Sequence, residues 1–492
     1  MATIRPRGGG CCPSRPKGAA APDRTLLSTD QVPIEHVGDH CWALSFDEVG
    51  ARFKQLSAEQ QRAVLTELRS LTQEQAAAAA CAASHIDAVA AKMAEVADED
   101  RLPAMHPELP KAMWDILNGK LVEQLLEHTP LVDLDYLVTL VTQGGVLPAG
   151  RQNVPPAAFI TQDNVWRLKL YNKERVKGAL PVLSFSYPWL DWWHPDQHGA
   201  QMRRVLPVLK AMLEEAKRDS PHCTIGVMID FLSLPQKPFA SDRDAQNFGL
   251  SLKNINGWYY HKNIYTLLIT QPPPEGAKYT NTRLHSQRGW CYFEKAASMA
   301  IKRSYCLLDM GKYNGAKTFI GKYVLESSSS CIGQMKAGRE PPISPPTFSE
   351  KLRAGVASGD FKFTANADME LVIGQYEKGF VEAINVVAEH EDPVARLLDF
   401  MDLKWGDAQA LELLTALRFA VKHCKFPRGP VCIFCTDGNE ISDALLREMP
   451  PQSTVLAKGN GEGFDPNDVD WGVPGDAQRV WLGKFFLGSP AS

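Results

Sequence analysis

Residues 180–187 read Leu-Pro-Val-Leu-Ser-Phe-Ser-Tyr, a short and mostly apolar run that predicts a buried strand. Three similar runs follow it along the chain, at 224–231, 264–270 and 304–310. Strands that are apolar throughout, rather than alternating with polar residues, are typical of a parallel sheet whose two faces are both covered by helices. The four runs therefore predict an α/β fold.

Helical patterns fill the intervals between these strands. The stretch 202–216 has apolar residues at helical spacing, and its Pro207 predicts a kink or a late start. The stretches 245–261 and 286–301 predict two further helices. Because right-handed crossovers leave few topologies, we expect a flavodoxin-like sheet over residues 160–330.

The helix predicted at 286–301 contains Trp290-Cys291-Tyr292-Phe293-Glu294. Residues four apart lie on one helix face, so Trp290 and Glu294 are expected to project together. Phe293 and its apolar neighbours would pack this helix onto the sheet, which leaves Glu294 at the edge of a buried seam. The alternative is a half-buried surface acid neutralised by Arg288 or Lys295.

Polar and aromatic side chains follow the strands at their carboxyl ends, where ligands bind in open α/β sheets. Carboxylates suit ribose hydroxyls or a developing cation, and aromatic rings suit a flat heterocycle. Aspartates here are also favoured helix N-caps, which is the competing interpretation for Asp191 and Asp196. The residues expected to bind substrate are Ser186, Tyr187, Asp191, Asp230, Ser233 and Trp290.

The order of these motifs resembles that of TIR (Toll/interleukin-1 receptor) domains. Ser186-Tyr187-x-x-x-Asp191 resembles the box that ends their first strand, and Arg243-Asp244 is similar to a pair in a later loop. Trp290-Cys291-x-x-Glu294 is similar to the Trp-Cys-x-x-Glu of their third helix. The cluster 189–196 departs from the family pattern, so we expect a divergent TIR-like domain.

The resemblance implies a catalytic role for Glu294 in cleaving the nicotinamide–ribose bond of NAD, as glycohydrolase or cyclase. Glycoside hydrolysis usually needs two carboxyl groups, because the leaving oxygen must be protonated. In NAD the leaving group is a cationic ring nitrogen that departs neutral, so one carboxylate beside the sugar can suffice. NAD or a related nucleotide is the expected substrate, and no cofactor or metal is expected.

Two other functions fit the same residues. One is a non-catalytic scaffold in which the TIR-like domain self-associates and the flanking modules bind protein partners, because a fold does not decide function. The other is a nucleoside-processing transferase that uses the same carboxylate chemistry. Turnover of NAD and the effect of Glu294→Gln distinguish the enzyme from the scaffold.

The remaining sequence predicts flanking modules. Residues 1–40 are expected to be a disordered tail, with a transit peptide as the alternative, and 41–150 a helical module. A Pro-rich linker is expected at 336–350, and an irregular tail at 451–492. Between them, 351–450 is expected to hold helices and a degenerate segment that resembles a leucine-rich repeat, in which Asn439 occupies the turn; an ordinary αβ unit is the alternative.

Composition limits location and partners. The net charge of −4 favours neither nucleic acid nor an anionic membrane, and no apolar run is long enough to span a bilayer. Eleven scattered cysteines fit a reducing compartment, so a cytoplasmic location is expected. Cys432 and Cys435 have poor spacing for a zinc site and are expected in the core.

Overall fold

The computed structural model describes residues 57, 58, 62, 111–171, 179–218, 220–276, 278–320, 329–336, 338–363, 367–391, 395–400, 403–428, 431–434, 439–446, 448 and 453–455. Contacts divide the chain into two units, Met1–Gln75 and Ala76–Ser492. Only three described residues lie in the first unit, so the fold below is that of the second. The expected tail at 1–40 and most of the expected module at 41–150 lie outside the described residues. Of the irregular tail expected at 451–492, only 453–455 are described, and they form a strand.

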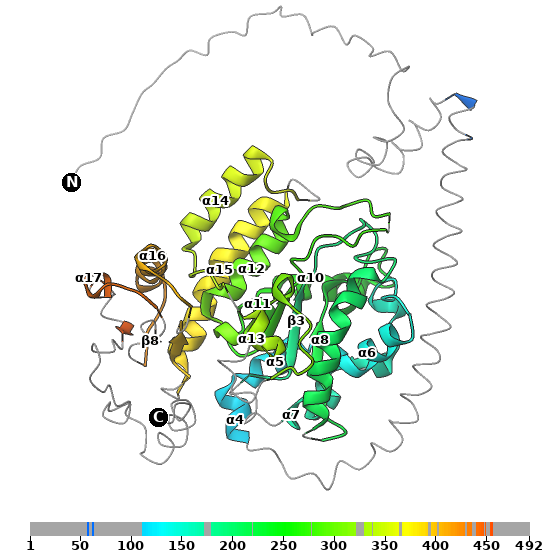
Figure 1. The fold of residues 1–492 in the computed structure, drawn as a ribbon, viewed down its shortest axis with the longest axis horizontal. Helices are drawn as coiled ribbons and strands as arrows, with labels where there is room; N and C mark the ends of the chain where they lie inside the picture. Colours follow the sequence, from blue (N-terminus) through cyan, green and yellow to red (C-terminus); the bar gives the residue numbers. More distant parts are fainter. Residues whose placement is uncertain are drawn as a thin grey trace, which may run out of the picture. The chain divides into compact units, whose positions relative to one another are not determined.

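A six-stranded, mostly parallel sheet organises this unit (Figure 1). Its order is β2 (Phe159–Ile160), β1 (Leu131–Asp133), β4 (Gly226–Met228), β3 (Val182–Ser186), β5 (Tyr265–Leu268) and β6 (Leu307–Asp309). The four strands from β4 to β6 are parallel, and they lie inside the four apolar runs of the sequence. The prediction of a parallel α/β sheet is confirmed, with each strand shorter than its apolar run.

The antiparallel edge was not expected. β1 pairs antiparallel with both β4 and β2, although its residues fall in the region predicted to be helical. Asp133 ends this strand, wholly buried, and pairs with the Arg167 guanidinium at 2.5 Å while accepting a hydrogen bond from Thr224. Three residues carry too little periodicity to predict a strand, and this pairing depends on partners some 90 residues away.

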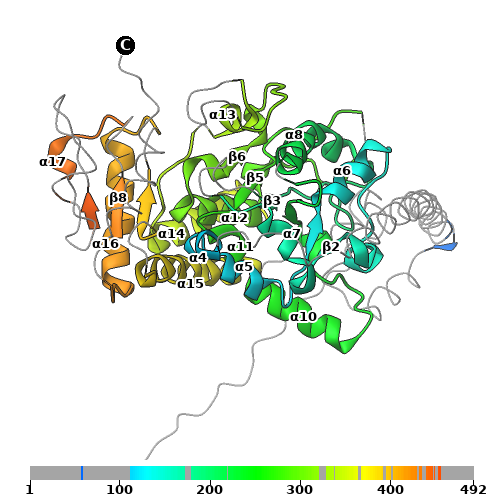
Figure 2. The same ribbon diagram turned by 90° about the horizontal axis from the view of Figure 1, so that it is seen from below.

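Helices cover both faces of the sheet (Figure 2). α6 (Leu134–Thr142) and α8 (Ala200–Lys217) lie on one side, while α11 (Asn256–Tyr260), α12 (Gly289–Ile301) and α15 (Asp368–Glu389) lie on the other. Successive strand residues alternate between the two cores, as the pleat requires: Leu183 and Phe185 pack with α8, and Val182 packs on the α12 side.

The predicted helices are present with different ends. α8 starts at Ala200 and continues through Pro207, so the proline does not delay its start. The stretch 245–261 forms two helices, α10 (Asp242–Lys253) and α11, which are separated at Asn254. The other helices of the described residues are α4 (Lys111–Ile116), α5 (Gly119–Leu125), α7 (Trp166–Lys169), α9 (Asp230–Ser233), α13 (Cys331–Met335), α14 (Pro345–Ser358), α16 (Asp407–His423) and α17 (Asp443–Leu446).

The segment expected to be a Pro-rich linker is packed into the fold. The Arg339 guanidinium is buried and donates to the carbonyls of Met299 and Asp399, beneath the ring of Phe400. Ser344 caps α14, whose first residue is Pro345, a favoured position for proline. The prolines therefore begin a helix here instead of forming a spacer.

A second, three-stranded parallel sheet follows, formed by β7 (Leu397–Asp399), β8 (Val431–Phe434) and β9 (Ser453–Val455) in chain order. Asn439 connects its loops. Its Oδ1 accepts from the amides of Leu403 at 3.1 Å and Trp405 at 2.9 Å, and its Nδ2 donates to the carbonyl of Phe400 at 2.7 Å. One side chain thus satisfies three backbone groups of the β7–α16 loop. The metal-ligand question at Cys432 and Cys435 lies outside the described side chains.

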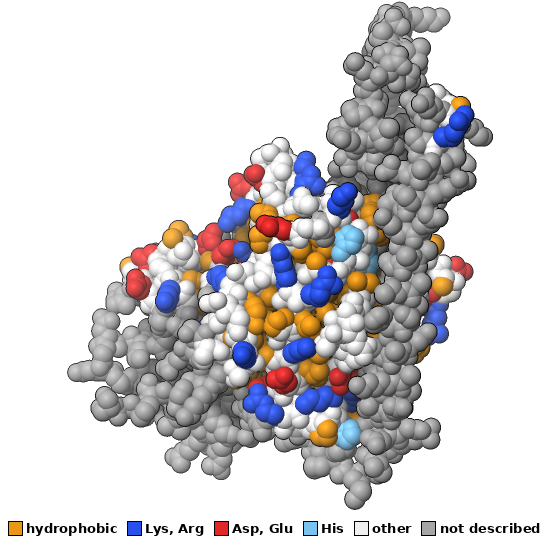
Figure 3. Space-filling model, turned by 45° about the vertical axis from the view of Figure 1, so that its right-hand side comes forward, with side chains coloured by type: hydrophobic (Ala, Val, Ile, Leu, Met, Phe, Trp, Pro, Cys, Tyr) orange, Lys and Arg blue, Asp and Glu red, His pale blue; other side chains and the backbone are white. Residues whose placement is uncertain are grey.

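On the face shown in Figure 3, basic and acidic side chains are interspersed with hydrophobic ones. None of the helices among the described residues is long and apolar enough to cross a membrane. Within the same residues, no group of three or more His, Cys, Asp or Glu side chains is placed to hold a metal ion.

Candidate functional site

Glu294 lies at the tip of the first parallel strand. Ser186 is the last residue of β3, and its side chain is on the sheet face that packs against α12. Its hydroxyl donates to Glu294 Oε2 at 2.6 Å, across 108 residues of sequence. At the start of α12, Gly289 leaves room for the Phe363 ring, which lies 2.1 Å from where a Cβ would stand. Of the predicted site residues, these two are in direct contact.

His285 completes a chain of hydrogen bonds with this pair. Its Nε2 lies 2.7 Å from Ser186 Oγ, and its side chain is buried in the short 3-10 helix before α12. Tyr259, on α11, donates its hydroxyl to the carbonyl of Phe185 at 2.9 Å, and its side chain opposes the rise in the pKa of Glu294. Sequence reasoning missed both residues. His285 lies only five residues before Trp290, but nothing local shows that it turns toward β3.

Burial controls the protonation of the acids. Desolvation raises the pKa of Glu294 from 4.5 to about 8; the hydrogen bond from Ser186 opposes this rise, and the charge of Asp230 adds to it. Burial likewise raises the pKa of Asp230 to about 6, and the hydrogen bonds from the Phe231 amide and the Trp189 indole lower it in part. Two carboxyl groups with separated pKa values lie at adjacent strand ends, an arrangement that is typical of acid–base sites.

The neighbouring groups stay uncharged near neutral pH. Burial, with Lys295 and Arg288 nearby, lowers the pKa of His285 to about 3, so its imidazole is neutral. Burial raises the pKa of the Cys291 thiol well above its usual range, which disfavours the thiolate form that a nucleophile requires. Glu294 is therefore the group of this cluster whose charge changes near pH 8.

The predicted neutralisation of Glu294 by a basic neighbour is wrong. Lys295 pairs with Glu340 at 2.8 Å instead. The Arg288 guanidinium donates to the carbonyl oxygens of Trp189, Asn281 and Arg283, so it holds two loops together. The alternative of a surface acid balanced by a salt bridge does not apply.

Asp230 lies two residues after β4, at the start of α9 and beside the end of β3. The Trp189 indole donates to its Oδ2 at 3.2 Å, and its Oδ1 accepts from the Phe231 amide at 2.7 Å. Ser233, one turn later, is wholly buried, and its hydroxyl accepts weakly from the Ile229 amide at 3.4 Å. Asp230 therefore belongs to the cluster, whereas Ser233 stabilises the turn.

Three residues predicted to be near the ligand stabilise the loops instead. Tyr187 is buried and its hydroxyl donates to Asp196, which also accepts from Tyr279 at 2.7 Å and from the Met202 amide at 2.8 Å. The last of these bonds is to the first turn of α8, close to the expected N-cap role. Asp191 is wholly buried and accepts from the amide and hydroxyl of Thr280 at 2.9 and 3.0 Å.

Trp290 is also bonded within the protein. Its Nε1 donates to Asp368 Oδ2 at 3.0 Å, at the start of α15, and its ring meets Phe293 edge to face. The nearby His194 imidazole is held between the carbonyl of Leu147 and the amide of Asp196, which is a structural role. The indole beside Glu294 thus connects two helices.

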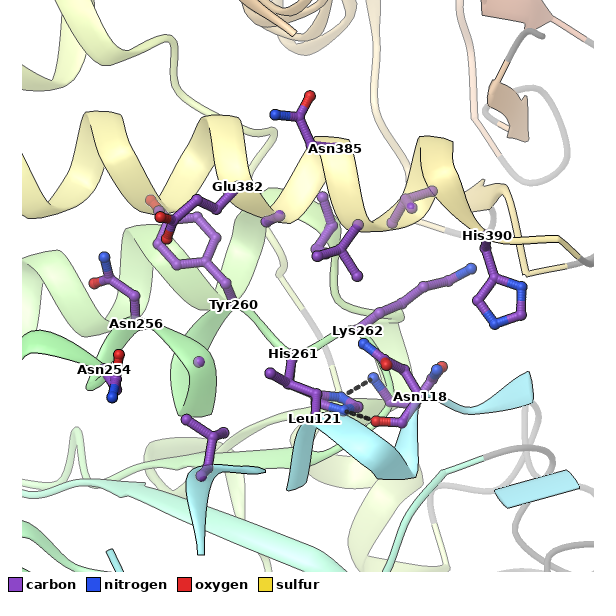
Figure 4. A pocket seen from close by; sticks show the side chains of 18 of the residues that line it. Asn118, Leu121, Asn254, Asn256, Tyr260, His261, Lys262, Glu382, Asn385 and His390 are labelled. Carbon is purple, nitrogen blue, oxygen red and sulfur yellow. Dashed lines mark hydrogen bonds between the residues drawn. The ribbon is translucent and has the colours of Figure 1, made fainter. Parts of the chain in front are cut away.

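A cavity of about 380 Å³ lies elsewhere, between α15, α11 and the α4–α5 segment (Figure 4). In that view, Lys262 and His390 lie toward one end and Asn256 and Glu382 toward the other. The His261 imidazole lies inside, with Nε2 on the carbonyl of Asn118 and Nδ1 on the amide of Asn263. No residue of the Glu294 cluster lines this cavity, so the cavity is separate from the cluster at the strand ends.

Comparisons with family models, with curated proteins and with solved structures found no match for this chain.

Proposed function

We propose that residues 160–330 form a divergent TIR-like domain that cleaves the nicotinamide–ribose bond of NAD, with Glu294 as the catalytic residue. The parallel strands support this proposal, because they lie in the order second, first, third, fourth, as expected for a flavodoxin-like sheet. The observation that carries it is the 2.6 Å hydrogen bond from Ser186 to Glu294 at the carboxyl end of β3.

The electrostatics of the site suit a cationic substrate. A carboxyl group with a pKa near 8 is mostly protonated in the empty site at neutral pH. A nicotinamide ring carries a positive charge, and an opposite charge nearby favours the ionised carboxylate. The carboxylate then stabilises the oxocarbenium character of the ribose as neutral nicotinamide leaves, in a partly desolvated position where charges interact strongly.

Glu294 and Asp230 have different roles in this proposal. Glu294, held by Ser186, is the group that would meet the ribose. Asp230 accepts a hydrogen bond from the Trp189 indole at the end of the next strand. Its pKa is lower than that of Glu294, so it stays ionised to a lower pH and adds negative potential that attracts a cation. The five cysteines whose side chains the structure describes are free, which supports a reducing, cytoplasmic location; they are Cys223, Cys291, Cys306, Cys331 and Cys424.

The test is release of nicotinamide from NAD by the concentrated full-length protein. The wild type is expected to release it, with kcat/KM rising as pH increases toward about 8, because the ionised form of Glu294 is the active one. Glu294→Gln is expected to abolish release while the protein stays folded. Glu340→Gln, which breaks only the exposed pair with Lys295, is the matched control and should retain activity.

A non-catalytic scaffold is the second proposal, and one feature favours it. Several side chains near the strand ends hydrogen-bond within the protein, so few are left there to bind a nucleotide. They are Tyr187, Asp191, Asp196 and Trp290. In that case the domain self-associates, and the β7–β9 module binds protein partners. Concentration-dependent assembly without nicotinamide release, and unchanged by Glu294→Gln, would establish the scaffold and reject the enzyme.

A further inference from the structure

Ser186 lies between a histidine and a carboxyl group and can donate to only one of them. Its Oγ is 2.7 Å from His285 Nε2 and 2.6 Å from Glu294 Oε2. A serine hydroxyl has one proton, so a hydrogen bond on each side requires it to donate to one neighbour and accept from the other. The proton positions along the three residues are therefore linked.

Two arrangements satisfy both hydrogen bonds when the proton of the un-ionised carboxyl group is on Oε2, the oxygen that faces Ser186. When Glu294 is ionised it can only accept, so Ser186 donates to it and His285 must donate from Nε2. When Glu294 is protonated it can donate to Ser186, which then donates to an unprotonated Nε2, and the imidazole proton is on Nδ1. The histidine is neutral in both arrangements and differs only in its tautomer.

The surrounding groups leave this linkage intact. Tyr259 and Cys291 face Glu294 and stay protonated, because burial raises the pKa of each well above its usual range. Asp230 is the other acid that affects Glu294, and it ionises at lower pH. Burial, together with the charges of Lys295 and Arg288, lowers the pKa of His285 and keeps it from taking a second proton. Near pH 8 the proton that moves is thus the one on Glu294.

We propose that Ser186 and His285 form a proton relay for Glu294, in which ionisation of the carboxyl group switches the tautomer of His285. The proton of Glu294 passes to Ser186 Oγ, the serine proton passes to Nε2, and the proton on Nδ1 leaves to water. One proton is released and no residue gains a net charge except Glu294. His285 is a positioning residue, since it acts through Ser186.

The use of the relay rests on the proposed function. Hydrolysis of NAD by water yields nicotinamide, ADP-ribose and one proton, and the relay gives that proton a path away from the sugar. The relay also orients the Ser186 hydroxyl so that it donates to the Glu294 carboxylate while positive charge develops on the ribose. This use predicts that His285→Gln, whose amide can donate but cannot exchange tautomers, lowers kcat and flattens its pH profile more than it changes KM.

The relay itself is tested without turnover, by ¹⁵N NMR of the full-length protein with labelled histidine between about pH 6 and 9. His285 is assigned by the signal that His285→Gln removes. Its two nitrogen signals are expected to exchange character with a midpoint near pH 8 while the ring stays neutral. Glu294→Gln and Ser186→Ala should each hold one tautomer over the whole range. His198→Gln, which removes an exposed histidine bonded to the carbonyl of Lys278, should leave the transition in place.

A His285 tautomer that is constant in the wild type, or a transition that persists in Ser186→Ala, would overturn the relay. Because the NMR signal requires no substrate, a normal tautomer transition in a protein that releases no nicotinamide would reject the proposed enzyme and keep the relay. Nicotinamide release by a protein whose His285 tautomer stays constant would reject the relay and keep the proposed enzyme.

Discussion

The raised pKa of Glu294 predicts a measurable loss of stability as the pH increases. In the unfolded chain this carboxyl group ionises near pH 4.5, and in the folded protein near pH 8. Below pH 4.5 it is protonated in both states, and across the interval of about 3.5 pH units only the unfolded state loses the proton. Each pH unit shifts the unfolding free energy by about 1.4 kcal/mol, so the whole interval contributes at most about 5 kcal/mol.

Glu294→Gln removes this dependence. Because Glu294 is only half-buried, water reduces the effect, and we expect the mutant to gain between about 2 and 4 kcal/mol over the wild type from pH 5 to pH 8. The measurement is urea unfolding of both proteins at several pH values, and the quantity of interest is the difference between them. Groups that titrate alike in both proteins cancel in that difference.

Glu340→Gln is the matched control, since its carboxylate is more than half exposed in its pair with Lys295. Its difference from the wild type should stay within about 0.5 kcal/mol at every pH. Wild-type and Glu294→Gln curves that run parallel from pH 5 to pH 8 would show that water reaches Glu294 freely. The desolvation on which the catalytic argument depends would then be absent.

Two further predictions concern the fold. Gly379→Ala should lower the free energy of unfolding by about 1–3 kcal/mol, because its Cβ would stand 2.4 Å from the buried Tyr260 ring. Gly374→Ala, on the same helix, meets nothing within 4 Å and should raise that free energy by up to about 1 kcal/mol. Equal unfolding midpoints in urea for the two variants would contradict this prediction. Asn439→Ala leaves three backbone groups without their partner and should cost about 2–4 kcal/mol, with faster hydrogen exchange at the Leu403 and Trp405 amides. Asn385→Ala, which removes a single hydrogen bond to the exposed Lys425 amide, should cost no more than about 1 kcal/mol; an equal cost for both asparagines would refute the bridging role.

Local periodicity predicted the elements of the sheet and failed where partners are distant. The four parallel strands and α8 were predictable because each is a continuous apolar or helical pattern. β1 was not, since its pairing with β4 is made across the fold. The Pro-rich stretch at 336–350 misled in the same way. Composition predicts a spacer there, but the contacts of Arg339 with Met299 and Asp399 bury it.

At the site, the sequence predicted which edge of the sheet carries polar side chains. It did not predict which of these side chains hydrogen-bond to one another. Glu294 and Ser186 converge as expected, because a strand end and the helix that packs on it bring their side chains together. Asp191 and Trp290 lie close to them in sequence order, yet each hydrogen-bonds to another part of the protein, at Thr280 and Asp368. Direction of a side chain depends on its packed neighbours, which no local pattern contains.

The amino-acid sequence alone determined that a parallel sheet forms and that a carboxyl group lies near the end of its first strand, because both follow from hydrophobic spacing. Only the tertiary structure decided that His285 bonds to Ser186, that Glu294 lies where its proton is held to about pH 8, and that the neighbouring basic residues point elsewhere. Those properties arise from desolvation and from contacts across some hundred residues, and both exist only once the chain is folded.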